Sequence, residues 1–200
     1  MIDTLKRYFD RLPIPHEKRE IFNLPNCITM LRIGVIPILF LLILSPGRML
    51  SLIIAILFII AALTDLLDGY IARKYNIVTT MGKLLDPIAD KLIVSTAMIM
   101  MIPIDRIPAW IVAIIIMRDV IVDGIRSIAS SDGMIIQASA LGKRKTLCQI
   151  IAVSALLIHY PLFGLDAHVV GSVVLYVALV LTLWSGVDYA MKFHQAAFKK

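Results

Sequence analysis

The chain has 200 residues, of which 60% are hydrophobic, and its mean hydropathy is +0.89. Soluble domains are usually about 45–50% apolar, so this composition excludes an ordinary soluble domain and favours a protein embedded in a bilayer. The net charge of +6 would suggest a nucleic-acid partner in a soluble protein, but in a membrane protein the placement of charge matters more than its sign, and we expect no such partner.

The first 22 residues are charged and lack a long apolar run. Ile2, Leu5, Phe9 and Leu12 share one helical stripe with basic residues around it. That pattern is typical of an amphipathic helix lying on an anionic membrane surface, and a frayed polar tail is the alternative. We expect residues 1–22 to form a juxtamembrane segment without a cleavable signal, because no small-residue cleavage site accompanies the first apolar run.

Six apolar segments follow, each close to the ~20 residues that a bilayer-spanning helix needs. Turn-forming stretches such as Ser45-Pro46-Gly47 separate them. The sequence therefore predicts an all-α integral membrane domain over residues 23–192 and a basic cytoplasmic tail over 193–200. The predicted spans are Ile28–Leu44, Leu50–Arg73, Gly82–Ile104, Pro108–Ser130, Leu147–Phe163 and His168–Tyr189.

Lysine and arginine are distributed asymmetrically about these spans. Fifteen of the twenty lie on the side that would hold both chain ends, and only Arg48 and Arg106 lie on the other side. Because positively charged loops stay in the cytoplasm, we expect both termini to be cytoplasmic. An even number of spans agrees with this orientation.

Four aspartates, Asp65, Asp68, Asp86 and Asp90, lie inside apolar spans, where a charge costs at least ~2.5 kcal/mol. At 1.5 Å per residue, Asp65 and Asp90 are each ~12 Å from the cytoplasmic ends of their spans, and the other two are ~6–8 Å from those ends. The two pairs therefore lie at matching depth on adjacent antiparallel helices, so their faces can converge.

Four carboxylates in one low-dielectric pocket cannot all ionise without positive charge nearby. Protonation, pairing with a nearby lysine or arginine, and a divalent cation are three solutions, and a purely structural ion-pair network is the alternative to a functional site. Ligands that are all oxygen atoms favour a hard ion such as Mg²⁺ or Mn²⁺. Three small residues beside the acids leave a gap, which means either close helix packing or room for a flat ligand: Gly69, Ala72 and Gly82.

The stretch from Asp65 to Asp90 reads DLLDGYIARKYNIVTTMGKLLDPIAD. It fits D-x2-D-G-x2-A-R-x8-G-x3-D-x3-D at every fixed position and so resembles the defining motif of the CDP-alcohol phosphatidyltransferases. The resemblance implies six transmembrane helices, a homodimer, and a site that opens to the cytoplasm. It implies that Asp65, Asp68 and Asp86 bind two Mg²⁺ or Mn²⁺ ions, and that Asp90 lies at the same metal site and acts as the general base. The implied contacts of the CDP-lipid are Asp65, Asp68, Gly69, Ala72, Arg73, Gly82, Asn26 and Thr29.

Residues 23–38 and 117–149 resemble the corresponding parts of bacterial phosphatidylglycerophosphate synthases. Within the second stretch, Arg118, Arg126, Lys143 and Lys145 form a basic group on the cytoplasmic side of the acids, and this group suits a phosphorylated acceptor. Alternatively, these charges only set the topology. The resemblance implies transfer from CDP-diacylglycerol to sn-glycerol 3-phosphate in the lipid of a bacterial inner membrane.

Other readings stay open. The acceptor could instead be inositol phosphate, serine or phosphatidylglycerol. An ion-coupled transporter could use the aspartates as a relay, although it would distribute polar groups across the membrane rather than crowd them on one side. A structural scaffold is the third class. We expect Cys27 and Cys148 to be packing residues and the four histidines to be surface residues: His16, His159, His168 and His194.

Overall fold

The computed structural model describes residues 47–74, 80–131, 140–162 and 164–197, and, nearer the N-terminus, residues 30, 34, 36–38 and 41–44. Within the helices, the side chains at 65–74, 80–90 and 140 lie outside the described part. The predicted interfacial segment 1–22 lies outside it entirely, as do Asn26, Thr29 and the end of the predicted tail at 198–200.

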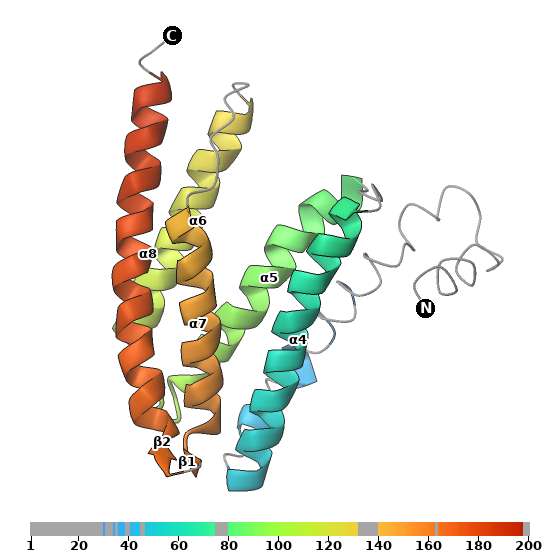
Figure 1. Ribbon diagram of the computed structural model, residues 1–200, viewed down its shortest axis with the longest axis vertical. Helices are drawn as coiled ribbons and strands as arrows, with labels where there is room; N and C mark the ends of the chain where they lie inside the picture. The colour runs from blue at the N-terminus through green and yellow to red at the C-terminus, as the bar shows by residue number, and fades with distance from the viewer. Residues whose placement is uncertain are drawn as a thin grey trace, which may run out of the picture.

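Long helices make up most of the described chain, and they run alternately up and down (Figure 1). The C-terminal end of α4, the starts of α5 and α7 and the C-terminal ends of α6 and α8 lie toward one end of the molecule. The start of α4, the α5–α6 connection and a small hairpin lie toward the other, which we call the hairpin end. The helices are α4 (Arg48–Lys74), α5 (Thr80–Met101), α6 (Ala109–Ser131), α7 (Ala140–Ile158) and α8 (Ala167–Ala197).

Each of the second to sixth predicted spans overlaps one of these helices, so the all-α prediction is confirmed for the described part of the chain. Of the first predicted span, residues 30, 34, 36–38 and 41–43 are helical. The sixth span was predicted to end at Tyr189, but α8 continues to Ala197, where Asp188 and Lys192 form an i,i+4 ion pair on its surface. Such pairs stabilise a helix that has left an apolar environment.

The predicted fifth span, Leu147–Phe163, is wrong at both ends. The helix α7 ends at Ile158 because His159 adopts a left-handed backbone conformation (φ 62°) that ends the helix. Two short antiparallel strands follow, β1 (Pro161–Leu162) and β2 (Leu165–Asp166), joined through Gly164 at φ 81°. At its other end α7 begins at Ala140, seven residues before the predicted start at Leu147. Residues 140–146 are helical although three of them are basic, and their low hydropathy had excluded them from the predicted span.

Helix α7 is central, since it contacts α4, α5 and α8. Its approach to α8 is close at Gly171, where an added Cβ would lie 2.8 Å from Cγ of Leu156. Apolar side chains from all five helices meet in one core, which stabilises the bundle by removing their surface from its surroundings. The most deeply buried are Phe58, Ile54, Met98, Met101, Ile111, Ile115, Leu156, Leu157, Leu175 and Val153.

Arg106, which follows α5, is a buried charge at the hairpin end. Its guanidinium donates to the carbonyl of Leu157 at 2.8 Å and to Oγ of Ser51 at 2.9 Å. Arg48 donates from the first residue of α4 to the carbonyl of Pro161 at 3.3 Å. Both arginines expected on the outer side of the membrane therefore lie at the hairpin end. Arg106 connects the α5–α6 segment to α4 and α7, and Arg48 connects α4 to β1.

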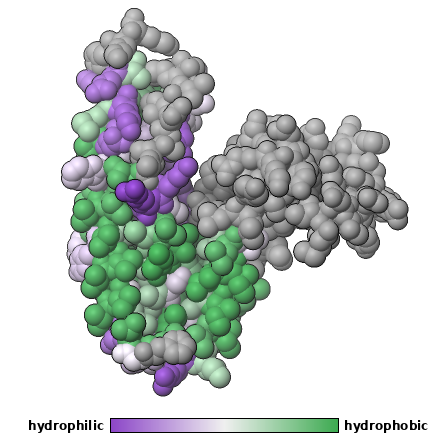
Figure 2. Space-filling model, in the orientation of Figure 1, coloured by the Kyte–Doolittle hydropathy of each residue, from purple (hydrophilic) through white to green (hydrophobic). Residues whose placement is uncertain are grey.

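Helix α8 is the one described helix that is long and apolar enough throughout to cross a bilayer, and the shorter apolar stretches are Arg48–Thr64 and Lys91–Met101. On the face shown in Figure 2, apolar surface covers most of the half nearer the hairpin, and polar surface gathers at the hairpin tip and in the opposite half. On α8, the exposed apolar side chains include Val173, Val177, Val180, Trp184 and Val187. An exposed apolar face of this kind is suited to contact with lipid chains. The topology of six spans stays a prediction.

Candidate functional site

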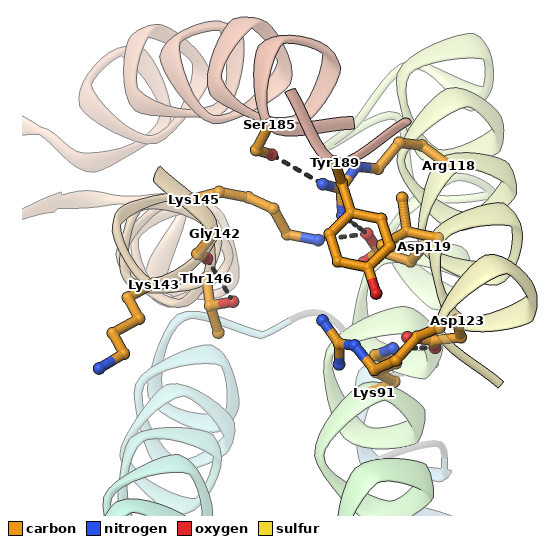
Figure 3. Close-up of a pocket in the computed structure, with 12 residues that line it drawn as sticks. Lys91, Arg118, Asp119, Asp123, Gly142, Lys143, Lys145, Thr146, Ser185 and Tyr189 are labelled. Carbon is orange, nitrogen blue, oxygen red and sulfur yellow. Dashed lines mark hydrogen bonds and ion pairs between the residues drawn. The ribbon is translucent and has the colours of Figure 1, made fainter. Parts of the chain in front are cut away.

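Four helices enclose a polar pocket at the end of the bundle away from the hairpin (Figure 3). Its volume is about 200 Å³, smaller than the roughly 300–1,000 Å³ usual for drug-sized ligands. Five basic and two acidic side chains line it, so the pocket favours a small anion. The lining residues are Lys91, Arg118, Asp119, Val122, Asp123, Arg126, Gly142, Lys143, Lys145, Thr146, Ser185 and Tyr189.

Helix α6 supplies the largest share of this lining. Arg118, Val122 and Arg126 recur every four residues, as do Asp119 and Asp123, so the two rows share one face of the helix. That face turns toward α7 and α8, and it leaves the side chains of Arg118 and Asp119 only 14% and 16% exposed.

Asp119 joins two of the cations. Its Oδ1 accepts from Nη1 of Arg118 at 3.0 Å and also from the ammonium of Lys145 on α7. Lys145 is buried, with its side chain 6% exposed. Removing one partner of a buried ion pair is strongly destabilising. The carboxylate of Asp119 therefore offsets the cost of burying Arg118 and Lys145, and it holds the two cations side by side.

Arg118 rests on α8. Its Nη2 donates to Oγ of Ser185 at 2.8 Å, and Ser185 donates in turn to the carbonyl of Thr182. Gly186 makes the approach possible, because a Cβ there would lie 3.1 Å from Nε of Arg118 and 3.3 Å from its Cγ. The guanidinium is therefore held on two sides, by α6 and by α8.

An ion pair between Lys91 and Asp123 connects α5 to the pocket. Lys91 directly follows Asp90, one of the four aspartates singled out from the sequence. The pair therefore places the part of α5 that carries Asp90 next to the basic pocket. This is the arrangement expected if the aspartates and the basic residues bind two substrates that react with each other.

Tyr189 closes the pocket from α8. The guanidinium carbon of Arg126 lies 5.6 Å from the centre of its ring, which is within the range of a cation–π contact. Tyr189 is only 4% exposed, and its hydroxyl has no hydrogen-bond partner among the described residues. Nε of Arg118 is likewise buried there without a partner.

The structure brings together all four residues predicted to bind the acceptor phosphate. Arg118, Arg126, Lys143 and Lys145 come from two helices, and each lines the pocket. Their convergence was expected from the cytoplasmic placement of the charges and from the family resemblance. Their role as phosphate ligands stays a prediction.

The four aspartates are placed by their helices alone. Asp65 and Asp68 lie in the C-terminal part of α4, and Asp86 and Asp90 lie in the N-terminal half of α5, so the antiparallel arrangement expected from the sequence is confirmed. Their side chains lie outside the described residues, as do those of Gly69, Ala72, Arg73 and Gly82. A hard divalent cation is compatible with the donor set because all four aspartates offer only oxygen.

Sequence reasoning missed the contribution of α8 to this site. Thr182, Ser185 and Tyr189 stand at i, i+3 and i+7 in an otherwise apolar helix, and all three are buried. That helical stripe of polar residues was the signal that could have found them. Asp119 is itself recognisable in the sequence as a charge inside an apolar span, but its pairing with Lys145 of α7 was not predicted.

Comparison with known proteins decides the family. Residues 22–184 match the family model described as CDP-alcohol phosphatidyltransferase. The chain belongs to this family. A relative from Bacillus subtilis (strain 168), named CDP-diacylglycerol–glycerol-3-phosphate 3-phosphatidyltransferase, is 47% identical over 86% of the chain and 95% of its own length. Relatives of the same name from Rickettsia typhi and Salmonella choleraesuis are 39% and 34% identical, each over 84% of the chain and 94% and 93% of their own lengths.

The match to the CDP-alcohol phosphatidyltransferases includes all four aspartates and the four predicted acceptor residues. It ends at residue 184, one position before Ser185. The part of α8 that holds Arg118 and closes the pocket therefore lies just beyond the matched residues. As a member of this family, the chain is a transferase of phospholipid synthesis.

Proposed function

We infer that this chain transfers the phosphatidyl group of CDP-diacylglycerol to sn-glycerol 3-phosphate, giving phosphatidylglycerophosphate and CMP. The names of its relatives support this activity, and those relatives are matched over nearly their whole lengths. The structural observation that carries the acceptor assignment is the pocket in which Arg118, Arg126, Lys143 and Lys145 meet.

A phosphorylated acceptor fits this pocket better than a neutral one. The guanidinium of Arg118 and the ammonium of Lys145 are nearly buried, and such groups are costly to hold unless they meet negative charge. Asp119 and Asp123 leave an excess of three positive charges among the lining side chains, if each basic group is protonated. A phosphate monoester supplies the missing negative charge and matches arginine and lysine donors, whereas serine supplies no phosphate.

The chemistry is an attack by an acceptor hydroxyl on the phosphorus that carries the diacylglycerol. A bond forms from the acceptor oxygen to that phosphorus, the bond to the CMP oxygen breaks, and CMP departs. In this mechanism Asp90 takes the proton of the attacking hydroxyl, which makes the oxygen a better nucleophile. The basic pocket binds and orients the acceptor so that its hydroxyl faces the donor.

Asp65, Asp68, Asp86 and Asp90 would hold two Mg²⁺ or Mn²⁺ ions, as expected for carboxylate ligands. Divalent ions bound there would stabilise negative charge on the diphosphate of the donor. Further donor contacts are proposed from residues of the motif and of the first predicted span: Gly69, Ala72, Arg73, Gly82, Asn26 and Thr29.

The setting proposed for this reaction is a bacterial inner membrane. The acyl chains of CDP-diacylglycerol stay in the lipid while its head group reaches the aspartates. Six spans with both termini in the cytoplasm, and a homodimer, complete the proposal.

The test is CMP release by the purified, reconstituted chain, with the acceptor varied. We expect turnover with glycerol 3-phosphate and Mg²⁺ or Mn²⁺, none after chelation, and little with serine, inositol phosphate or phosphatidylglycerol. The Asp90→Asn variant should lose at least about a hundredfold in turnover, the usual contribution of a general base. Asp188→Asn, which removes a surface ion pair outside the pocket, is the matched control and should stay active. Equal turnover with another acceptor would overturn the acceptor assignment.

A further inference from the structure

Two hydrogen-bond donors are buried in the wall of the basic pocket without a partner among the described residues: the hydroxyl of Tyr189 and Nε of Arg118. Buried polar groups in proteins are almost always hydrogen-bonded, so two orphans in one pocket point to a ligand that is absent from the structure. We propose that Tyr189 is a specificity-determining residue whose hydroxyl donates a hydrogen bond to the phosphate of the acceptor. This inference rests on the proposed function.

The burial of Tyr189 carries the first step. The residue is 4% exposed, so its hydroxyl cannot be satisfied by bulk water, and an unsatisfied buried hydroxyl destabilises the folded protein. A phenylalanine would pack the same ring without that cost. The hydroxyl therefore has to be explained by something other than packing, and Tyr189 is one of the residues that line the pocket in Figure 3.

The surroundings of the ring indicate which kind of ligand it meets. Arg126 lies over the ring at 5.6 Å, and Arg118 and Lys145 line the same pocket. A hydroxyl in a pocket lined by these three cations suits a ligand oxygen that carries negative charge. A phosphate group offers several charged oxygens, so it can accept the O–H of Tyr189 while it pairs with the arginines and lysines that line the same pocket.

The arginine is already oriented for this ligand. Its Nη1 donates to Asp119 and its Nη2 to Ser185, so two of its three nitrogens have a described partner and Nε does not. Ser185 and Tyr189 are four residues apart on α8 and so lie on one face of that helix. One face of α8 therefore both holds Arg118 and presents the hydroxyl.

The experiment is Tyr189→Phe, which removes the hydroxyl and keeps the ring. We expect the KM for glycerol 3-phosphate to rise about tenfold, since a hydrogen bond to a charged group is lost. The KM for CDP-diacylglycerol should change less than about twofold. The melting temperature without ligand should stay the same or rise, because an unsatisfied hydroxyl has been removed.

Tyr176→Phe is the matched control, because it makes the same change on the same helix. Tyr176 is 49% exposed, packs near Trp110 and does not line the pocket, so its variant should match the wild type in both KM values. A purely structural role for Tyr189 predicts instead a lower melting temperature and similar changes in both KM values, and that result would overturn the proposal.

Inhibition by inorganic phosphate tests whether the hydroxyl of Tyr189 binds the phosphate of the acceptor or its glycerol part. If it reads phosphate, the inhibition constant of phosphate against glycerol 3-phosphate should rise in Tyr189→Phe by about the same factor as the KM. An unchanged inhibition constant would contradict the phosphate assignment. Failure of the proposed function is a separate outcome, since it would appear in the wild type as CMP release that does not depend on glycerol 3-phosphate.

Discussion

His159 is a residue whose chemistry follows from its place in the fold. It comes directly after α7, and its ring lies 4.8 Å from that of His168, centre to centre. Burial lowers the pKa of His159 below its ordinary value of 6.5; the charge of Arg106 and then His168 lower it further, and Asp166 opposes them. Both histidines were expected on the surface, but each is only partly exposed, because the hairpin folds over the end of α7.

This lowered pKa predicts a pH dependence of stability. The folded protein binds fewer protons at His159 than the unfolded chain does, so this contribution to stability is present above pH 6.5 and falls as the pH drops from 6.5 toward the lowered pKa. We expect His159→Asn to lose less of its melting temperature between about pH 7.5 and pH 5 than the wild type loses. Asparagine is chosen because it tolerates the positive φ at this position.

Thermal unfolding in detergent at several pH values measures the effect. His194→Asn, at an exposed position near the end of α8, controls for the loss of a histidine as such and should keep the wild-type slope. An equal or steeper fall in His159→Asn would show that protonation of His159 does not oppose folding.

The residues of the pocket separate what the sequence alone could predict from what it could not. Arg118 and Lys145 were predicted from the family resemblance of residues 117–149 and from the basic group that they form on the cytoplasmic side. Ser185 and Gly186 were not predicted, because a serine or a glycine in a span costs little and usually reflects helix packing. Their role depends on the neighbouring helix: only when α6 lies against α8 does Arg118 meet them.

At the scale of the elements, hydropathy locates helices but does not set their ends. The spans on α4, α5 and α6 were predicted to within three residues, because apolar composition and helix coincide there. The start of α7 was missed because the stretch Gly142–Thr146 is basic and helical, and its end was missed because a single backbone angle at His159 stops the helix. Such features follow from local backbone geometry and tertiary contacts rather than from hydropathy.

Gly171 gives a test of how closely α7 and α8 must approach. A Cβ there would lie 2.8 Å from Cγ of Leu156, 2.9 Å from its backbone nitrogen and 3.1 Å from Cβ of Ala155. Because a backbone atom cannot move aside without shifting the helix, we expect Gly171→Ala to destabilise the fold by about 1–3 kcal/mol, as overpacked cores do. The measurement is chemical or thermal unfolding in a fixed detergent.

Gly124→Ala is the matched control for that substitution. Gly124 lies inside α6, and nothing stands within 4 Å of an added Cβ. Its variant should be neutral or more stable by up to about 1 kcal/mol, because alanine favours a helix over glycine. If Gly171→Ala and Gly124→Ala were equally stable, the close approach of α7 to α8 would not require a glycine at position 171.

At the scale of the whole molecule, charge follows the direction of the bundle. The five basic residues of the pocket gather at one end, whereas Arg48 and Arg106 tie helices together at the hairpin end. For Arg126, Lys143 and Lys145 the sequence predicted this segregation from the counts of lysine and arginine on each side, whereas Lys91 and Arg118 lie inside predicted spans. It could not predict which side chains hold the basic group in place, since that depends on α6, α7 and α8 meeting around Asp119 and Ser185.

The direction of α8 across the membrane supplies the last prediction. Its 31 residues extend about 46 Å at 1.5 Å per residue, which exceeds the ~30 Å hydrocarbon core, so its two ends should lie on opposite sides. In a background without Cys27 and Cys148, single cysteines replace Leu165, which is 66% exposed in the hairpin, and Ala197 at the end of α8. An impermeant maleimide added to intact cells should label Leu165→Cys at once and Ala197→Cys only after permeabilisation, because the proposed topology puts the hairpin end outside and the C-terminus in the cytoplasm. Retained CMP release shows that each variant is folded, and labelling of both cysteines from the same side would contradict a membrane-spanning α8.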